Sequence, residues 1–119
     1  MHAKDLANLI DGDVSVQDID REKVARDTSL FYVKPEIVIY PKSASDISHI
    51  VSYVHRIKEK GQDISITMRS AGTCMTGGPL SQSIVVDTSR YMNHITDVTD
   101  YSATAESGTY YRDFEKETL

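Results

Sequence analysis

One stretch decides how the rest of the chain is interpreted: Arg69-Ser70-Ala71-Gly72-Thr73-Cys74-Met75-Thr76-Gly77-Gly78-Pro79, here called the glycine loop. It consists of small and hydroxyl-bearing residues between two apolar, β-rich runs. Its glycines lack a Cβ, so the backbone can take positive φ and turn successive amides toward an anion. Arg69 adds a planar donor fork suited to phosphate oxygens, and Ser70, Thr73 and Thr76 add hydroxyl donors. The loop therefore indicates a phosphate site, with a diphosphate as its natural guest.

Two common nucleotide-binding motifs do not fit the glycine loop. Gly72 and Gly77 have the spacing of the Walker A glycines, but Gly78 and Pro79 occupy the positions of the lysine and the hydroxyl residue. The Rossmann pattern G-x-G-x-x-G is absent, and Pro79 leads toward a strand rather than a helix. Both of these enzyme classes are disfavoured. A glycine-rich turn that only connects two strands remains the plain alternative.

The sequence around the loop predicts an α+β fold, a small sheet with packed helices. Residues 36–40 are apolar and β-branched and predict a strand that ends at Pro41. The clearest helix begins at a cap on Ser43 or Ser45 and ends at Gly61. Its apolar positions follow helical spacing: Ile47, Ile50, Val51, Val54 and Ile57. The other expected elements are short helices near residues 3–10 and 20–27, strands at 64–67 and 83–87, a hairpin from 95–98 and 102–106, and helical spacing at 110–119.

Three segments resemble one known family in order and spacing. The first is Pro35-Glu36-Ile37-Val38-Ile39-Tyr40-Pro41-Lys42-Ser43-Ala44-Ser45-Asp46-Ile47. The second is the glycine loop, R-S-A-G-T-C-M-T-G-G against a family pattern of about R-G-G-G-T-G-x-T-G-G. The third comprises residues 84–92 with their D-x-S-R turn, followed by 105–109. The chain resembles the N-terminal half of the FAD-binding domain of the vanillyl-alcohol oxidase or p-cresol methylhydroxylase (PCMH) type. The resemblance implies the first subdomain of that fold.

The N-terminal residues are most similar to the group that contains glycolate oxidase and D-lactate dehydrogenase, on residues 11–15 and 25–32. This resemblance implies hydride transfer to FAD from a 2-hydroxy acid such as glycolate or D-lactate. Electrons would pass on to a quinone, a cytochrome or an iron–sulfur region. Some relatives attach the flavin to a loop histidine, but the matching position here is Thr73, which implies noncovalent FAD. The catalytic base is expected beyond Leu119, so no catalytic residue is assigned.

The resemblance also implies a set of cofactor-binding residues. The amides of residues 70–73, together with Thr76, Gly77 and Gly78, would hold the FAD pyrophosphate. The full set is Pro41, Arg69, Ser70, Ala71, Gly72, Thr73, Met75, Thr76, Gly77, Gly78 and Gly108. Ser70, Ala71 and Cys74 stand where the family has glycines. They fit if their φ values are negative, whereas a left-handed position would strain the loop.

Domain organisation follows from the same resemblance. We expect a helical leader at residues 1–32 and a partial PCMH-type domain at 33–119. The family's flavin domain is longer and is followed by a substrate domain, so the chain is expected to be a fragment that is inactive alone. A half-domain with an exposed apolar face can also dimerise. Two alternatives stay open. One is another enzyme of this fold, such as a sugar or lactone oxidase, an alkyl-glycerone-phosphate synthase or a UDP-sugar reductase. The other is a non-catalytic module that binds phosphate or a protein.

Composition limits the partners. Thirteen Lys and Arg against eighteen Asp and Glu give a net charge of −5, which argues against general binding to nucleic acid or anionic membranes. No signal peptide and no apolar run of ~18 residues is visible, so a cytoplasmic location is expected. Cys74 is the only cysteine. His49 and His55 lie six apart on a helix and so on different faces, and no metal site is expected.

Overall fold

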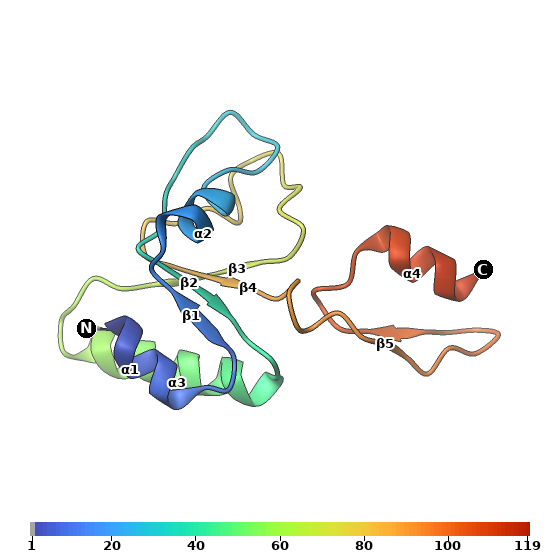
Figure 1. Ribbon diagram of the computed structural model, residues 1–119, viewed down its shortest axis with the longest axis horizontal. Helices are drawn as coiled ribbons and strands as arrows, with labels where there is room; N and C mark the ends of the chain where they lie inside the picture. The colour runs from blue at the N-terminus through green and yellow to red at the C-terminus, as the bar shows by residue number, and fades with distance from the viewer. Residues whose placement is uncertain (1) are drawn as a thin grey trace.

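The computed structural model describes residues 2–119 and confirms the α+β class (Figure 1). Its elements in chain order are α1 (His2–Leu9), β1 (Asp13–Ser15), α2 (Asp18–Lys23), β2 (Ile37–Tyr40), α3 (Ala44–Glu59), β3 (Ile66–Arg69), β4 (Ile84–Asp87), β5 (Ile95–Thr96), β6 (Thr104–Ala105) and α4 (Tyr111–Thr118). Four strands form one sheet, with α1 and α3 on one face and α2 on the other (Figure 1).

The sheet has the strand order β1-β2-β4-β3. β2, β4 and β3 are mutually parallel, whereas β1 pairs antiparallel with β2. The chain leaves β2 through α3, crosses to β3 at the far edge and returns through the glycine loop to β4 in the middle. The carboxyl ends of the three parallel strands therefore lie along one edge, at Tyr40, Arg69 and Asp87. This edge is called the carboxyl edge below.

Both faces of the sheet are covered, which explains why β2 and β4 are continuous apolar runs. Ile37 and Ile39 face the core formed with Leu6 of α1 and with Ile50 of α3. The alternating residues Val38 and Tyr40 of β2 face a smaller cluster with Val24 and Val85. Central parallel strands that are buried on both faces show this kind of near-continuous hydrophobic sequence.

Helix α3 begins and ends as its sequence predicts. The Ser43 hydroxyl accepts a hydrogen bond from the amide of Asp46 (3.3 Å) and caps the N-terminus. Gly61, with φ +88°, follows the last turn. Ile50, Tyr53 and Val54 are buried, but Val51 is 51% exposed. The buried stripe is therefore narrower than the apolar pattern suggested.

Two strands differ from the sequence-based expectation. β1 lies in the leader, where only helices and a turn were expected, because three residues are too short to show a period. β3 runs from Ile66 to Arg69, two residues later than the expected 64–67. Ile64 is buried in the core, but the pairing with β4 begins at Ile66. The later register extends β3 to the start of the glycine loop.

The C-terminal elements project away from the sheet (Figure 1) and extend the molecule to 50 Å along its longest axis. β5 and β6 form the expected hairpin, and α4 confirms the helical spacing of the last residues. No residue of α4 is buried. Within residues 2–119, no helix is both long and apolar enough to span a membrane.

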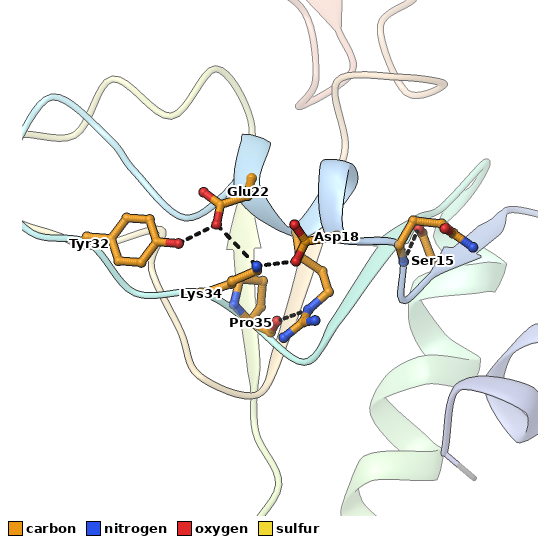
Figure 2. Close-up of polar contacts among 8 residues, drawn as sticks. Ser15, Asp18, Glu22, Tyr32, Lys34 and Pro35 are labelled. Atoms are coloured by element: carbon orange, nitrogen blue, oxygen red, sulfur yellow. Dashed lines mark hydrogen bonds and ion pairs between the residues drawn. The ribbon is translucent and has the colours of Figure 1, made fainter.

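Helix α2 is fastened to the segment that leads into β2 (Figure 2). Lys34 forms ion pairs with Asp18 and with Glu22 (3.1 Å in the second pair). The Tyr32 hydroxyl donates to Glu22, and Nε of Arg21 donates to the Pro35 carbonyl (2.6 Å). These contacts close the ends of the leader loop, residues 24–33, which lies beside the glycine loop.

Candidate cofactor site

The carboxyl edge carries a cavity of about 440 Å³. Tyr40 of β2, Arg69 of β3 and Asp87 of β4 contribute to its wall, because their strands end together. Lys23, Arg69 and Arg90 place three cationic side chains around it, against the one carboxylate of Asp87. Open parallel sheets bind ligands outside the carboxyl ends of their strands. The cavity therefore suits an anionic ligand.

The glycine loop forms a second cavity of about 480 Å³ beside the first, lined by residues 68–74 with Gly78 and Pro79. Gly72 and Gly77 take positive φ, +71° and +81°. Among the residues described, Asp97 is the only non-glycine with positive φ. Ser70, Ala71 and Cys74 therefore keep ordinary backbone conformations although they stand where relatives have glycines. The strain that these departures threatened is absent from this part of the chain.

The amides of the glycine loop divide into two groups. Within residues 2–119, the amides of Ser70, Ala71, Gly72 and Thr73 have no protein acceptor. The second half of the loop is internally engaged, because the Gly77 amide donates to Oδ2 of Asp27 (2.9 Å). The amides of Thr76 and Gly78 point to the sulfur of Cys74. The open donors of the loop thus lie in its first four residues after Arg69.

Arg69 joins the loop to both neighbouring segments. Its Nη1 donates to the carbonyl of Val24 (3.2 Å). Its own carbonyl accepts hydrogen bonds from the amide (2.9 Å) and the hydroxyl (3.3 Å) of Thr88. The guanidinium also lies against Gly72. The side chain is thus held at the mouth of both cavities, where its remaining donors can face an anion.

The other expected site residues lie in different surroundings. Pro41 is buried at the carboxyl end of β2. Met75 is 78% exposed and lines neither of the two cavities. Gly108 lies against the backbone of Thr88 and Met92, and its amide donates to the Met92 carbonyl (2.8 Å). Close backbone packing is a sufficient reason for a glycine there.

Several residues at this site were not anticipated from the sequence. Arg90 stacks on the ring of Tyr40, with its Cζ 3.6 Å from the centroid, and pairs with Asp13 (3.2 Å). Asp13 also accepts a hydrogen bond from the Tyr91 hydroxyl. Oδ1 of Asp87 accepts from the amide (2.9 Å) and hydroxyl (2.6 Å) of Ser89 and so caps the turn after β4. Arg90 belongs to the D-x-S-R turn, but nothing in the sequence pairs it with Asp13.

Cys74 is half-buried within the loop. Hydrogen bonds from the Thr76 hydroxyl, and from the amides of Thr76 and Gly78, lower the pKa of its thiol. This surrounding agrees with a small packing residue. Within residues 2–119, no three His, Cys, Asp or Glu side chains form a group that can hold a metal ion.

Comparison with known proteins relates this geometry to a family. Residues 35–118 match the model of the FAD binding domain. D-2-hydroxyglutarate dehydrogenase of Escherichia coli is 32% identical over 87 residues, which are 73% of this chain and 8% of the relative. The enzyme of the same name from Haemophilus influenzae is 33% identical over 85 residues, covering 71% and 8%. The chain thus spans a small part of the length of these relatives.

Solved structures show the same fold. 6-Hydroxy-D-nicotine oxidase from Arthrobacter nicotinovorans superposes with a TM-score of 0.73 at 26% identity, over 91% of this chain and 23% of that one. Alkyldihydroxyacetonephosphate synthase gives a TM-score of 0.71 at 18% identity, over 87% and 21%, and so shows likeness of fold alone. The match of the family model covers most of the chain, and FAD is the cofactor of this family. The chain belongs to the FAD-binding domains of the PCMH-type flavin oxidoreductases.

Proposed function

We propose that the glycine loop holds the diphosphate of a noncovalently bound FAD in an enzyme that oxidises a 2-hydroxy acid. The observation that carries this proposal is the run of four amides, residues 70–73, that have no protein acceptor in the described part of the chain. They lie next to Arg69 at the carboxyl edge. Consecutive free amides beside a guanidinium form a concave anion site.

The residues present fit a diphosphate. Gly72 has positive φ, and its Cα side is already filled by the Arg69 guanidinium, so the backbone approaches the site without a side chain. Arg69, Lys23 and Arg90 supply positive charge in a chain whose net charge is negative. We assign Ser70, Ala71, Gly72 and Thr73 to the diphosphate through their amides, with Arg69 as the charged partner. Thr73, standing where some relatives have a histidine, supports noncovalent attachment.

Bound FAD would supply a hydride acceptor for the carbinol carbon of the substrate. The described residues bind and orient the cofactor, and none of them is assigned as the catalytic base. Their contribution is to fix the diphosphate at the carboxyl edge.

The proposed substrate is a 2-hydroxy acid. The resemblance favours glycolate or D-lactate, and the names of the curated relatives add D-2-hydroxyglutarate. We propose a quinone, a cytochrome or an iron–sulfur region as the electron acceptor. A small dicarboxylate or monocarboxylate fits a dehydrogenase of this family, and the length of the acid is the property to be tested.

Anaerobic titration of the purified full-length gene product tests this proposal. Glycolate, D-lactate and D-2-hydroxyglutarate are added in turn, and bleaching of the flavin absorbance is recorded. One of these acids should bleach the flavin, and the L-enantiomers of the chiral acids serve as matched controls. A flavoprotein that no 2-hydroxy acid reduces would contradict the proposed substrate class while leaving FAD binding intact.

A further inference from the structure

The leader loop grips the glycine loop at points about fifty residues apart in sequence. The Thr28 amide donates to the Cys74 carbonyl (3.1 Å), and its hydroxyl lies 2.9 Å from the Thr73 carbonyl and 2.8 Å from that of Cys74. Oδ2 of Asp27 accepts the Gly77 amide (2.9 Å). The residues after Thr73 are thus tied to the leader, whereas residues 70–72 are not.

The Asp27 carboxylate is fully engaged in this contact. Its Oδ1 accepts from the amide of Ser29 (2.8 Å) and from the Ser29 hydroxyl, while Oδ2 holds Gly77. Desolvation acts in the opposite direction, but these hydrogen bonds prevail and keep the pKa of the Asp27 carboxyl below its ordinary value. The group is therefore an ionised acceptor in the folded protein.

The leader loop is itself fixed, so it can act as a support. Arg26 and Tyr32 form a β-bridge, and the Arg26 guanidinium lies 4.8 Å from the Tyr32 ring centroid. The Val33 amide donates to the Ala25 carbonyl (2.9 Å). Lys34 anchors the far end to α2 (Figure 2). Phe31 lies beside Gly77, where an added Cβ would be 3.1 Å from its ring.

A carboxylate next to a diphosphate site needs a reason, because like charges repel. Two roles differ in sign. As a competitor, Asp27 would occupy the Gly77 amide in place of phosphate, and its removal would strengthen FAD binding. As a support, it would hold Gly77 in its left-handed conformation and shape the loop, and its removal would weaken FAD binding. The additional bonds from Thr28 to two loop carbonyls favour the support, since carbonyls do not bind phosphate.

We infer that Asp27 and Thr28 are positioning residues that brace the second half of the glycine loop and leave the amides of residues 70–73 for the diphosphate. This inference rests on the proposed function. It also assigns the Gly77 amide to Asp27 rather than to FAD. Neither side chain contacts the cofactor, and both act through the backbone of residues 73–77.

The test measures the dissociation constant for FAD with the full-length gene product, stripped of flavin and titrated by flavin fluorescence. Asp27→Ala should weaken FAD binding about tenfold or more, since a hydrogen bond to a charged group is lost. Asp27→Asn should weaken it less. Thr28→Val should also weaken it, and Thr28→Ser, which keeps the hydroxyl, should restore it. Asp18→Asn removes the same charge from exposed α2 and should leave the constant unchanged.

The melting temperature of each stripped variant separates positioning from general stability. The brace predicts a larger effect on FAD affinity than Asp18→Asn gives at equal loss of melting temperature. Unchanged affinity in both Asp27→Ala and Thr28→Val, or tighter binding in Asp27→Ala, would overturn the inference. If Asp27→Ala does not fold, the pair Thr28→Val and Thr28→Ser decides alone. Wild-type protein that takes up no FAD would instead overturn the proposed function, and the brace with it.

Discussion

The guanidinium of Arg69 lies directly over the left-handed residue Gly72. A Cβ at Gly72 would be 2.2 Å from Nη2 and 2.5 Å from Cζ of Arg69, and the φ of Gly72 is +71°. The same arginine bonds the Val24 carbonyl of the leader loop. A side chain at position 72 is therefore opposed twice, by backbone strain and by displacement of the cation that we assign to the diphosphate.

Replacement of Gly72 should remove flavin. Gly72→Ala adds about 1–2 kcal/mol of left-handed strain and pushes Arg69 aside, so the purified protein should hold less FAD. Gly72→Val should abolish flavin retention. The measurement is the ratio of flavin to protein absorbance after gel filtration. Gly61→Ala is the matched control, because Gly61 has φ +88° but nothing within 4 Å. Equal flavin loss in both variants would contradict the assignment.

Gly108→Ala should lower the free energy of unfolding without acting on the glycine loop. Its Cβ would lie 2.0 Å from the Thr88 carbonyl oxygen and 2.6 Å from that of Met92, and backbone atoms cannot swing away as a side chain does. Overpacking of this kind costs about 1–3 kcal/mol or more. Urea unfolding measures the loss. The exposed neighbour Ser107→Ala should change stability by less than about 0.5 kcal/mol. A stable Gly108→Ala protein would refute this packing.

Asp46 links stability to pH. It is 2% exposed, and burial by itself raises its pKa. Three amides donate to its oxygens, those of Lys42 (2.9 Å), Asp11 (3.0 Å) and Gly12 (2.9 Å), and they outweigh burial and lower the pKa. A lowered pKa gives stability that is present above the unfolded value of about 3.9 and is lost as pH falls through the folded value.

Asp46→Asn should therefore cost about 1–3 kcal/mol near neutral pH, where an amide cannot satisfy three donors. The difference from wild type should shrink as pH falls below about 4, since wild type then loses the same carboxylate. Thermal unfolding across this range measures it. A difference that stays constant with pH would show that the carboxylate charge is not what holds the turn.

Arg90 fastens β1 to the turn after β4. Arg90→Ala loses the stacking on Tyr40 and the pair with Asp13, which together are worth about 1 kcal/mol at such a partly exposed site. Arg90→Lys keeps the charge but not the planar stack, so its loss should be intermediate. Denaturant unfolding compares the two. Arg56→Ala, whose Cζ is 5.9 Å from the Tyr53 centroid, should cost less. A lysine variant less stable than the alanine variant would contradict stacking as the cause.

Local sequence predicted the elements whose signals are local. Ser43, the apolar spacing and Gly61 defined α3, and the β-branched runs defined β2 and β4. β1 was missed because Asp13–Ser15 is held by pairing with β2 and by Arg90 rather than by any pattern of its own. The start of β3 was placed too early because Ile64 is buried before the strand begins.

The site was only partly predictable for the same reason. The residues of the glycine loop indicate its backbone conformation, and Gly72 and Gly77 do take positive φ. The contacts of Asp27 and Thr28 with that loop join residues about fifty positions apart, and no spacing rule connects them. The assignment of individual residues to FAD remains a prediction.

The central claim is that the amides of residues 70–73, with Arg69, bind the diphosphate of FAD. The most direct measurement is the visible absorption of the full-length gene product, purified without added cofactor and then denatured and filtered, for wild type and Gly72→Val. The account predicts a flavin spectrum that passes into the filtrate from wild type and is absent from the variant. A wild-type protein that has no flavin and takes none up, or a Gly72→Val protein with full flavin content, would contradict it.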